Sequence, residues 1–211
     1  MAAKSSPLIH YHAPNSRSAT IRWLFEELGN PPHELTVFNL KKNEHKSPEY
    51  LAINPMGKVP TIVHGKTVIT EAAAIAMYLA DLFPEKGLAP KTSDPERGTY
   101  LRWIVFNQAA VEPAIVDHAL KREQGPVAML PYGTYEETIE ALAGALRKGP
   151  YILGKTFSAA DVVVGSGVRW MLMFKLLPDR TEFTRYAERL SARPALQRAI
   201  AKDAELAAQQ A

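Results

Sequence analysis

Hydrophobic residues follow two different patterns along this chain. Up to about residue 83, short apolar runs rich in β-branched side chains alternate with stretches in which apolar residues recur every three or four positions. The first pattern is typical of strands and the second of amphipathic helices. From residue 95 onward only the helical spacing recurs. The chain is therefore predicted to begin with a mixed α/β part and to continue with an all-helical part.

The α/β part is predicted to run strand, helix, strand and then, after a connection, strand, strand, helix. The expected strands cover residues 8–11, 34–40, 59–63 and 67–69, and the expected helices cover 20–28 and 71–83. Gly65 lies in a tight turn between the last two strands, where positive φ is needed. Pro60 stands at the start of the third strand. This outline is the thioredoxin-like arrangement, an architecture that does not by itself define a function.

The second part is predicted to contain five helices, at residues 95–122, 135–147, 158–176, 181–192 and 194–208. Pro113 falls inside the first of them and predicts a kink. The third helix is the most apolar, which is typical of a helix in the middle of a bundle. Ser158 and Asp161 have the spacing of an N-capping box at its start, which is a folding element rather than a site.

A proline-rich segment separates the two parts. Three prolines and a glycine fall within residues 83–95, and this composition indicates a linker. We therefore predict an α/β domain at residues 1–83, a linker at 84–94 and an all-helical domain at 95–211.

The composition argues against several classes of function. The chain has 211 residues, of which 46% are hydrophobic and 22% charged, as in soluble globular proteins. No apolar run approaches about eighteen residues and no signal peptide is evident, so we expect no membrane span and a cytoplasmic location. The net charge of +3 is spread along the chain, which argues against a nucleic-acid partner. There is no cysteine, and this excludes thiol chemistry by the protein itself.

The histidines do not predict a metal site. None of the six forms a helical pair with an acidic residue at ligand spacing. His10 and His12 share one strand face but lack a third ligand. We therefore expect no bound metal.

The most informative motif combines Val59-Pro60 with Glu71-Ala72. Proline cannot donate to a sheet ladder, and a cis bond before Pro60 would turn the backbone N–H and C=O of Val59 toward a peptide-like ligand. Glu71 opens a helix whose first N–H groups can bind an anion. The alternative interpretation is an edge proline followed by an ordinary acidic residue at a helix start.

Both motifs, together with the domain order and the linker, resemble the cytosolic glutathione transferases over essentially the whole chain. The resemblance implies that glutathione is the co-substrate and that the protein is a homodimer. It implies that the main chain of Val59, next to the cis-proline Pro60, binds the cysteinyl part of glutathione. Glu71 and Ala72 would hold the γ-glutamyl amine and carboxylate, and Lys58 would contact the glycyl end.

One position departs from the family pattern. Transferases of this kind usually have serine where this chain has Ala72. The missing hydroxyl removes one hydrogen bond to the γ-glutamyl carboxylate, and a bond to a charged group contributes roughly 1.5–3 kcal/mol. The backbone N–H of Ala72 remains as a donor.

The resemblance places the group that activates the glutathione thiol at or just after the end of the first strand. Ser16 is the favoured candidate because it precedes a helix, Asn15 follows closely, and Tyr11 is third. For Ser16 the alternative is a plain helix N-cap. Arg17 occupies the position of the catalytic cysteine in the bacterial beta class, so the reductase chemistry of cysteine-type classes is not expected.

The helix from residue 95 would form the wall of a hydrophobic acceptor pocket between the domains, as the resemblance implies. The candidate pocket residues are Tyr100, Trp103, Phe106 and Asn107; the alternative is that they are core residues. We therefore expect a transferase that conjugates the glutathione thiolate to hydrophobic electrophiles, with peroxide reduction as a further activity. The alternatives are a non-catalytic interaction module of the same fold and a carrier of hydrophobic ligands.

Overall fold

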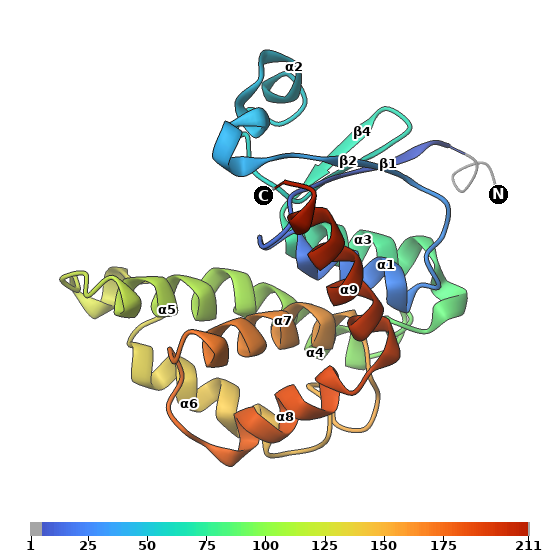
Figure 1. The fold of residues 1–211 in the computed structure, drawn as a ribbon. Coiled ribbons are helices and arrows are strands. Elements are labelled where there is room, and N and C mark those ends of the chain that lie inside the picture. The colour runs from blue at the N-terminus through green and yellow to red at the C-terminus, as the bar shows by residue number, and fades with distance from the viewer. Residues whose placement is uncertain (1–5, 211) are drawn as a thin grey trace. The chain divides into compact units, whose positions relative to one another are not determined.

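The computed structural model describes residues 6–210 (Figure 1). The chain forms two compact units. The first consists of the segment up to Lys86 together with the segment from Arg193 onward, and the second is Gly87–Ala192.

A four-stranded sheet forms the centre of the first unit. The strands are β1 (Leu8–His12), β2 (Glu34–Val37), β3 (Thr61–His64) and β4 (Thr67–Thr70), in the order β2-β1-β3-β4. The β1–β2 pair is parallel and the other two pairs are antiparallel. Helices α1 (Ala19–Glu27) and α3 (Ala72–Leu82) lie on one face of the sheet, and the short α2 (Pro48–Leu51) lies on the other side (Figure 1). The predicted thioredoxin-like α/β part is confirmed.

Two strand boundaries differ from the prediction by two residues or more. β3 begins at Thr61 rather than at residue 59, since Pro60 has no N–H to donate to the ladder. β2 ends at Val37, before the expected residue 40. The side chain of Asn39 accepts from two following N–H groups and starts a 3₁₀ turn there. Further 3₁₀ turns cover Glu44–Lys46, Pro84–Lys86 and Val127–Met129.

Helix α9 (Pro194–Ala208) packs on α1 and belongs to the first unit. Arg193 makes a two-pronged ion pair with Glu27, with both N···O distances 2.7 Å. Arg198 and Lys202 bind the two carboxylate oxygens of Glu26 at 2.8 and 2.6 Å. The predicted all-helical domain extended to residue 211, whereas the structure groups residues from 193 onward with the sheet. The amphipathic pattern gives the helix correctly but does not say which helix it packs against.

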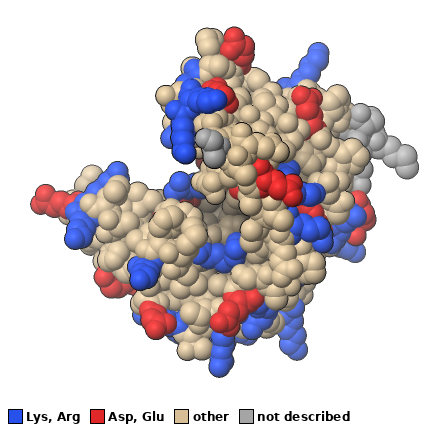
Figure 2. Space-filling view, viewed as in Figure 1, with Lys and Arg blue, Asp and Glu red and all other residues tan. Residues whose placement is uncertain are grey.

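The second unit is helical, as predicted. Its helices are α4 (Glu96–Phe106), α5 (Glu112–Ala119), α6 (Tyr135–Leu146), α7 (Ala159–Met173) and α8 (Thr181–Ser191). The long helix predicted at 95–122 is interrupted by a π-helical turn, Asn107–Val111, and Pro113 lies in the first turn of the helix that follows. Within residues 6–210 no helix is both long and apolar enough to cross a membrane. On the face shown in Figure 2, basic and acidic side chains are interspersed.

The predicted capping box at the start of α7 is present. The Ser158 hydroxyl accepts from the N–H of Ala160 at 3.2 Å, and Asp161 accepts from the N–H of Ser158 at 2.9 Å. Asp161 also accepts from the Ile152 N–H and the Tyr186 hydroxyl. The carboxyl therefore joins α7 to α8 and to the loop that precedes α7.

Candidate active site

Strand register brings the predicted site segments to one end of the sheet. Tyr11 of β1 pairs with Thr61 of β3, and Thr61 pairs with Thr70 of β4. The chain leaves β1 at this end, enters β3 there and leaves β4 there. The loop from Ala13 to Ser18, the Val59–Pro60 peptide and the start of α3 therefore lie at the same edge.

The Val59–Pro60 segment presents an unpaired stretch of backbone. Its peptide bond is cis, as the resemblance implied. Val59 is half-buried, and neither its N–H nor its C=O makes a hydrogen bond to any residue from 6 to 210. The neighbouring Lys58 carbonyl is fixed, because it accepts from the Tyr50 hydroxyl at 2.5 Å and from the Asn54 amide at 2.9 Å. The peptide of Val59 is thus available to an extended ligand on a firmly held support.

The start of α3 is open as well. Glu71 precedes the helix with φ 64° and ψ 119° and is exposed; a non-glycine residue in such a sparsely populated conformation costs of order 1–3 kcal/mol. Its side chain does not cap the helix. Within residues 6–210 the N–H groups of Ala72, Ala73 and Ala74 find no acceptor. Free N–H groups at a helix N-terminus, with the helix dipole, favour an anionic group.

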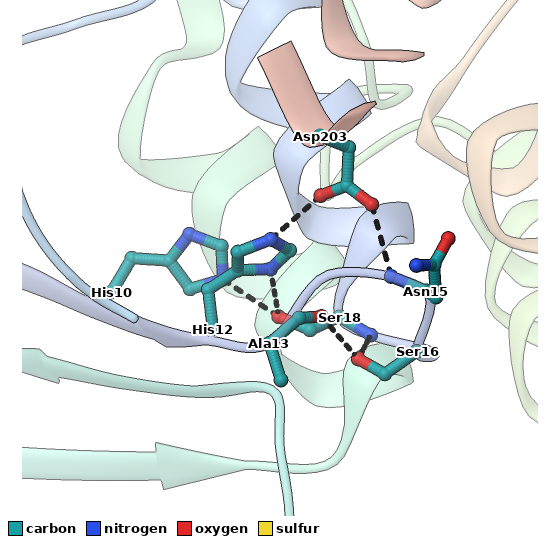
Figure 3. Close-up of polar contacts among 7 residues, drawn as sticks. All are labelled: His10, His12, Ala13, Asn15, Ser16, Ser18 and Asp203. Atoms are coloured by element: carbon teal, nitrogen blue, oxygen red, sulfur yellow. Dashed lines mark hydrogen bonds and ion pairs between the residues drawn. The ribbon is translucent and has the colours of Figure 1, made fainter. Parts of the chain in front are cut away.

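The loop before α1 contains the two favoured candidates for thiol activation (Figure 3). The Ser16 hydroxyl donates to the Ala13 carbonyl at 2.7 Å and accepts from the Ser18 N–H at 3.1 Å. Ser18, and not Ser16, directly precedes the first residue of α1. Asn15 adopts a left-handed conformation with φ 56°. Its side chain is exposed and makes no hydrogen bond within the described part of the chain, so its amide is an uncommitted donor.

Tyr11 lies on the other face of the sheet from His10 and His12. Its ring stacks on Phe38 at a centroid distance of 6.0 Å and contacts Tyr50 at 5.2 Å. Burial, reinforced by the charge of Glu34, raises the pKa of the Tyr11 phenol. A phenol with a raised pKa is a weaker proton donor. The rank of Tyr11 behind Ser16 and Asn15 stays a prediction.

Comparison with known proteins decides the family. The model of the glutathione S-transferase N-terminal domain matches residues 6–81. Glutathione S-transferase GST-4.5 of Xanthomonas campestris pv. campestris is 30% identical over 149 residues, which cover 66% of this chain and 71% of that protein. The chain belongs to the glutathione S-transferase family.

Solved transferases share the fold over nearly the whole length. A glutathione transferase from Methylococcus capsulatus str. Bath is 27% identical, with a TM-score of 0.76, and the match covers 94% of this chain and 99% of that one. A glutathione transferase from Burkholderia graminis is 25% identical, with a TM-score of 0.76, over 92% of this chain and 88% of that one. The Burkholderia protein was solved with two glutathione molecules bound per subunit.

The expected acceptor residues of this transferase-family chain lie in the second unit. Tyr100, Trp103 and Asn107 are buried there and Phe106 is half-buried. The Trp103 and Phe106 rings meet edge to face at 5.5 Å. Phe106 also packs against the cluster formed by Ala110, Ala114 and Tyr132. Burial therefore places Tyr100, Trp103 and Asn107 in the helical core, and ring contacts place Phe106 against it. Contact of these four residues with an acceptor stays a prediction.

The sequence did not predict a cluster of polar side chains beside the loop that precedes α1. Ser18 Oγ lies 2.8 Å from His12 Nδ1 and 3.2 Å from His10 Nε2. His12 Nε2 lies 2.6 Å from Asp203 Oδ1 on α9 (Figure 3). The shared face of the two histidines was visible in the sequence as alternation along β1. Nothing in the sequence connected the two histidines to Asp203. This residue also accepts a hydrogen bond from the N–H of the loop residue Asn15, from which it is 188 positions distant in the sequence.

Proposed function

We propose that this protein is a glutathione transferase that binds glutathione at the edge described above and activates its thiol at the loop before α1. The observation that carries the proposal is the unpaired peptide of Val59, at the same sheet end as the open first turn of α3. The cysteinyl N–H and C=O of glutathione complement the C=O and N–H of Val59. The γ-glutamyl carboxylate complements the free N–H groups at Ala72, and its amine complements the Glu71 carboxylate. The exposed ammonium of Lys58 complements the glycyl carboxylate.

Thiol activation requires a donor to the sulfur. A free cysteine thiol titrates near pKa 8.5 and is mostly protonated at neutral pH. Each unit by which donors lower that pKa corresponds to about 1.4 kcal/mol of preferential stabilisation of the thiolate. Ser16 can act as donor if its hydroxyl turns from the Ala13 carbonyl to the sulfur. The Asn15 amide is uncommitted and can donate without breaking an existing bond.

The second substrate belongs to the class of hydrophobic electrophiles, with organic peroxides as a further class. In the proposed reaction the glutathione thiolate attacks an electrophilic carbon, or the oxygen of a peroxide, of this second substrate. Trp103 and Phe106 are the side chains that we expect to contact it. The family resemblance implies a homodimer, and analytical ultracentrifugation would test this expectation.

An ultraviolet difference titration tests binding and activation together. Glutathione added to the protein near neutral pH is expected to give a saturable thiolate band. Lys58→Ala should weaken the apparent affinity several-fold, while Lys66→Ala, an exposed lysine at the opposite end of the sheet, should leave it unchanged. Binding without a band would favour a carrier, and no binding at millimolar glutathione would favour a non-catalytic interaction module.

Two variants separate the candidate donors. Ser16→Ala removes the hydroxyl, and Asn15→Gly removes the amide while tolerating the positive φ of that position. The variant that lacks the true donor should lose the thiolate band and most of the turnover with chlorodinitrobenzene. If both variants keep the band at full intensity, neither residue activates the thiol.

A further inference from the structure

A buried polar cluster connects α9 to the loop that precedes α1 (Figure 3). His10, His12 and Ser18 are fully buried, and the side chain of Asp203 is 13% exposed. None of the four takes part in the glutathione contacts proposed above. Polar groups in such a place are unfavourable unless each is paired, so the pairing in this cluster is informative.

The contacts and pKa shifts of the cluster determine which nitrogen of each histidine carries the proton. Burial lowers the pKa of His10 well below its usual value; for His12, burial lowers the pKa and the opposing effect of Asp203 is smaller. Both rings are therefore neutral at neutral pH. His10 Nε2–H then donates to Ser18, the Ser18 hydroxyl donates to His12 Nδ1, and His12 Nε2–H faces the Asp203 carboxylate. Arg22 of α1 adds a favourable positive charge beside that carboxylate.

An acid, a histidine and a serine in series also resemble the array that activates a serine nucleophile. Ser18 has a relative exposure of 0%, so its hydroxyl is closed to any substrate. The cluster therefore acts on the loop to which Ser18 belongs.

Asp203 holds this loop at two points. Its Oδ2 accepts from the backbone N–H of Asn15 at 3.1 Å. Its Oδ1 lies 2.6 Å from His12 Nε2, and His12 Nδ1 lies 2.8 Å from the Ser18 hydroxyl oxygen. Ser16 lies between the two points, and its hydroxyl accepts from the N–H of Ser18. Donors held in place before the substrate arrives stabilise a developing charge better than mobile ones.

We propose that Asp203 is a positioning residue for thiol activation, which fixes the loop that carries Asn15 and Ser16. The inference rests on the proposed function, since it concerns the same thiol. The ion pairs of Arg193 with Glu27 and of Arg198 with Glu26 hold α9, and with it Asp203, against α1. A segment near the C-terminus thereby sets the geometry of a site near the N-terminus.

Asp203→Asn tests the proposal with little change of shape. A carboxylate has two acceptor oxygens and a carboxamide has one, so the variant cannot accept from both the His12 Nε2–H and the Asn15 N–H. We expect the pKa of bound glutathione, measured from the thiolate band against pH, to rise by roughly one unit, so that kcat near neutral pH falls several-fold and by about tenfold at most. The affinity for glutathione should stay within about twofold, because Asp203 touches none of its binding groups.

Lys202→Ala is the matched control. It removes an ion pair between α9 and Glu26 at the neighbouring position without touching the loop, so it should lower the melting temperature and leave the thiol pKa unchanged. Ser18→Ala cuts the path from His12 to the loop, keeps α9 intact and should raise the thiol pKa in the same direction. If Asp203→Asn does not fold, the thiol pKa measured in Ser18→Ala tests the proposal instead.

Three results would overturn the proposal. An unchanged thiol pKa in folded Asp203→Asn would mean that Asp203 only anchors α9. An equal shift in Lys202→Ala would mean that the effect is general loosening. A wild-type protein without a thiolate band would overturn the proposed function itself, and this inference with it.

Discussion

Replacing Asp161 by asparagine separates the charge of a buried carboxyl from its shape. Oδ1 of Asp161 accepts from the Ile152 N–H at 2.7 Å and the Tyr186 hydroxyl at 2.9 Å, and an amide oxygen can keep both bonds. Oδ2 accepts from the Ser158 N–H at 2.9 Å. In the variant an amide NH₂ faces that N–H, and leaving one buried donor unsatisfied costs about 1–3 kcal/mol.

The negative charge of the ionised Asp161 carboxylate destabilises the parent protein, and the asparagine variant does not carry it. Burial is the largest influence on Asp161 and raises its pKa from 3.8 to about 6, although its hydrogen bonds oppose the rise. A shift of about two units corresponds to about 3 kcal/mol. Because the pKa is higher in the folded protein, this contribution to stability is fully present below the unfolded pKa and is lost as the pH rises through about 6. Asparagine does not titrate, so the destabilisation by the variant should shrink as the pH rises.

Urea unfolding of both proteins at about pH 4.5 and about pH 7.5 measures this change. We expect Asp161→Asn to be less stable by about 1–3 kcal/mol at the lower pH and the difference to move by about 2 kcal/mol in favour of the variant at the higher pH. Titration of His10 and His12 occurs in both proteins and cancels. Glu188→Gln, an exposed carboxylate on α8, should stay within about 0.5 kcal/mol of the parent at both values. A destabilisation by Asp161→Asn that is independent of pH, or that grows with pH, would refute the reasoning.

Three further changes have direct outcomes. Ala72→Ser restores a hydroxyl at the open turn of α3 and should lower the Kd for glutathione about tenfold or more in calorimetry; an unchanged Kd would show that the γ-glutamyl carboxylate does not reach this turn. Tyr50→Phe removes one of three donors to the Lys58 carbonyl and should raise the KM for glutathione a few-fold while kcat is kept. A fall in kcat alone would contradict a role in binding. Glu27→Gln weakens the two-pronged bond to Arg193 and should lower the melting temperature without changing the Kd for glutathione; an equal melting temperature would show that this pair does not hold α9.

The local features of the chain could be read from the sequence because they depend on neighbouring residues. Alternating and helical hydrophobic spacing gave the strands and helices of the first unit, and the capping box at Ser158 was recognisable from its spacing. The Val59-Pro60 and Glu71-Ala72 motifs were likewise recognisable from residue types at adjacent positions. Strand ends were less accurate, because the side chain of Asn39 ends β2 by a bond that the hydrophobic pattern does not encode.

Only the tertiary structure showed how distant segments share one site. The amphipathic pattern of residues 194–208 predicts a helix equally well against either unit. The ion pairs of Arg198 and Lys202 with Glu26, and of the preceding Arg193 with Glu27, place this helix on α1. The sequence likewise listed Asn15 and Ser16 as donors, but only the folded loop shows that Ser16 already donates to Ala13 while the Asn15 amide is uncommitted. The contact of Asp203 with His12 and Asn15 joins the two ends of the chain. Hydrophobic spacing is a property of neighbouring residues, whereas such a contact depends on the packing of whole elements, and no pattern within one segment records it.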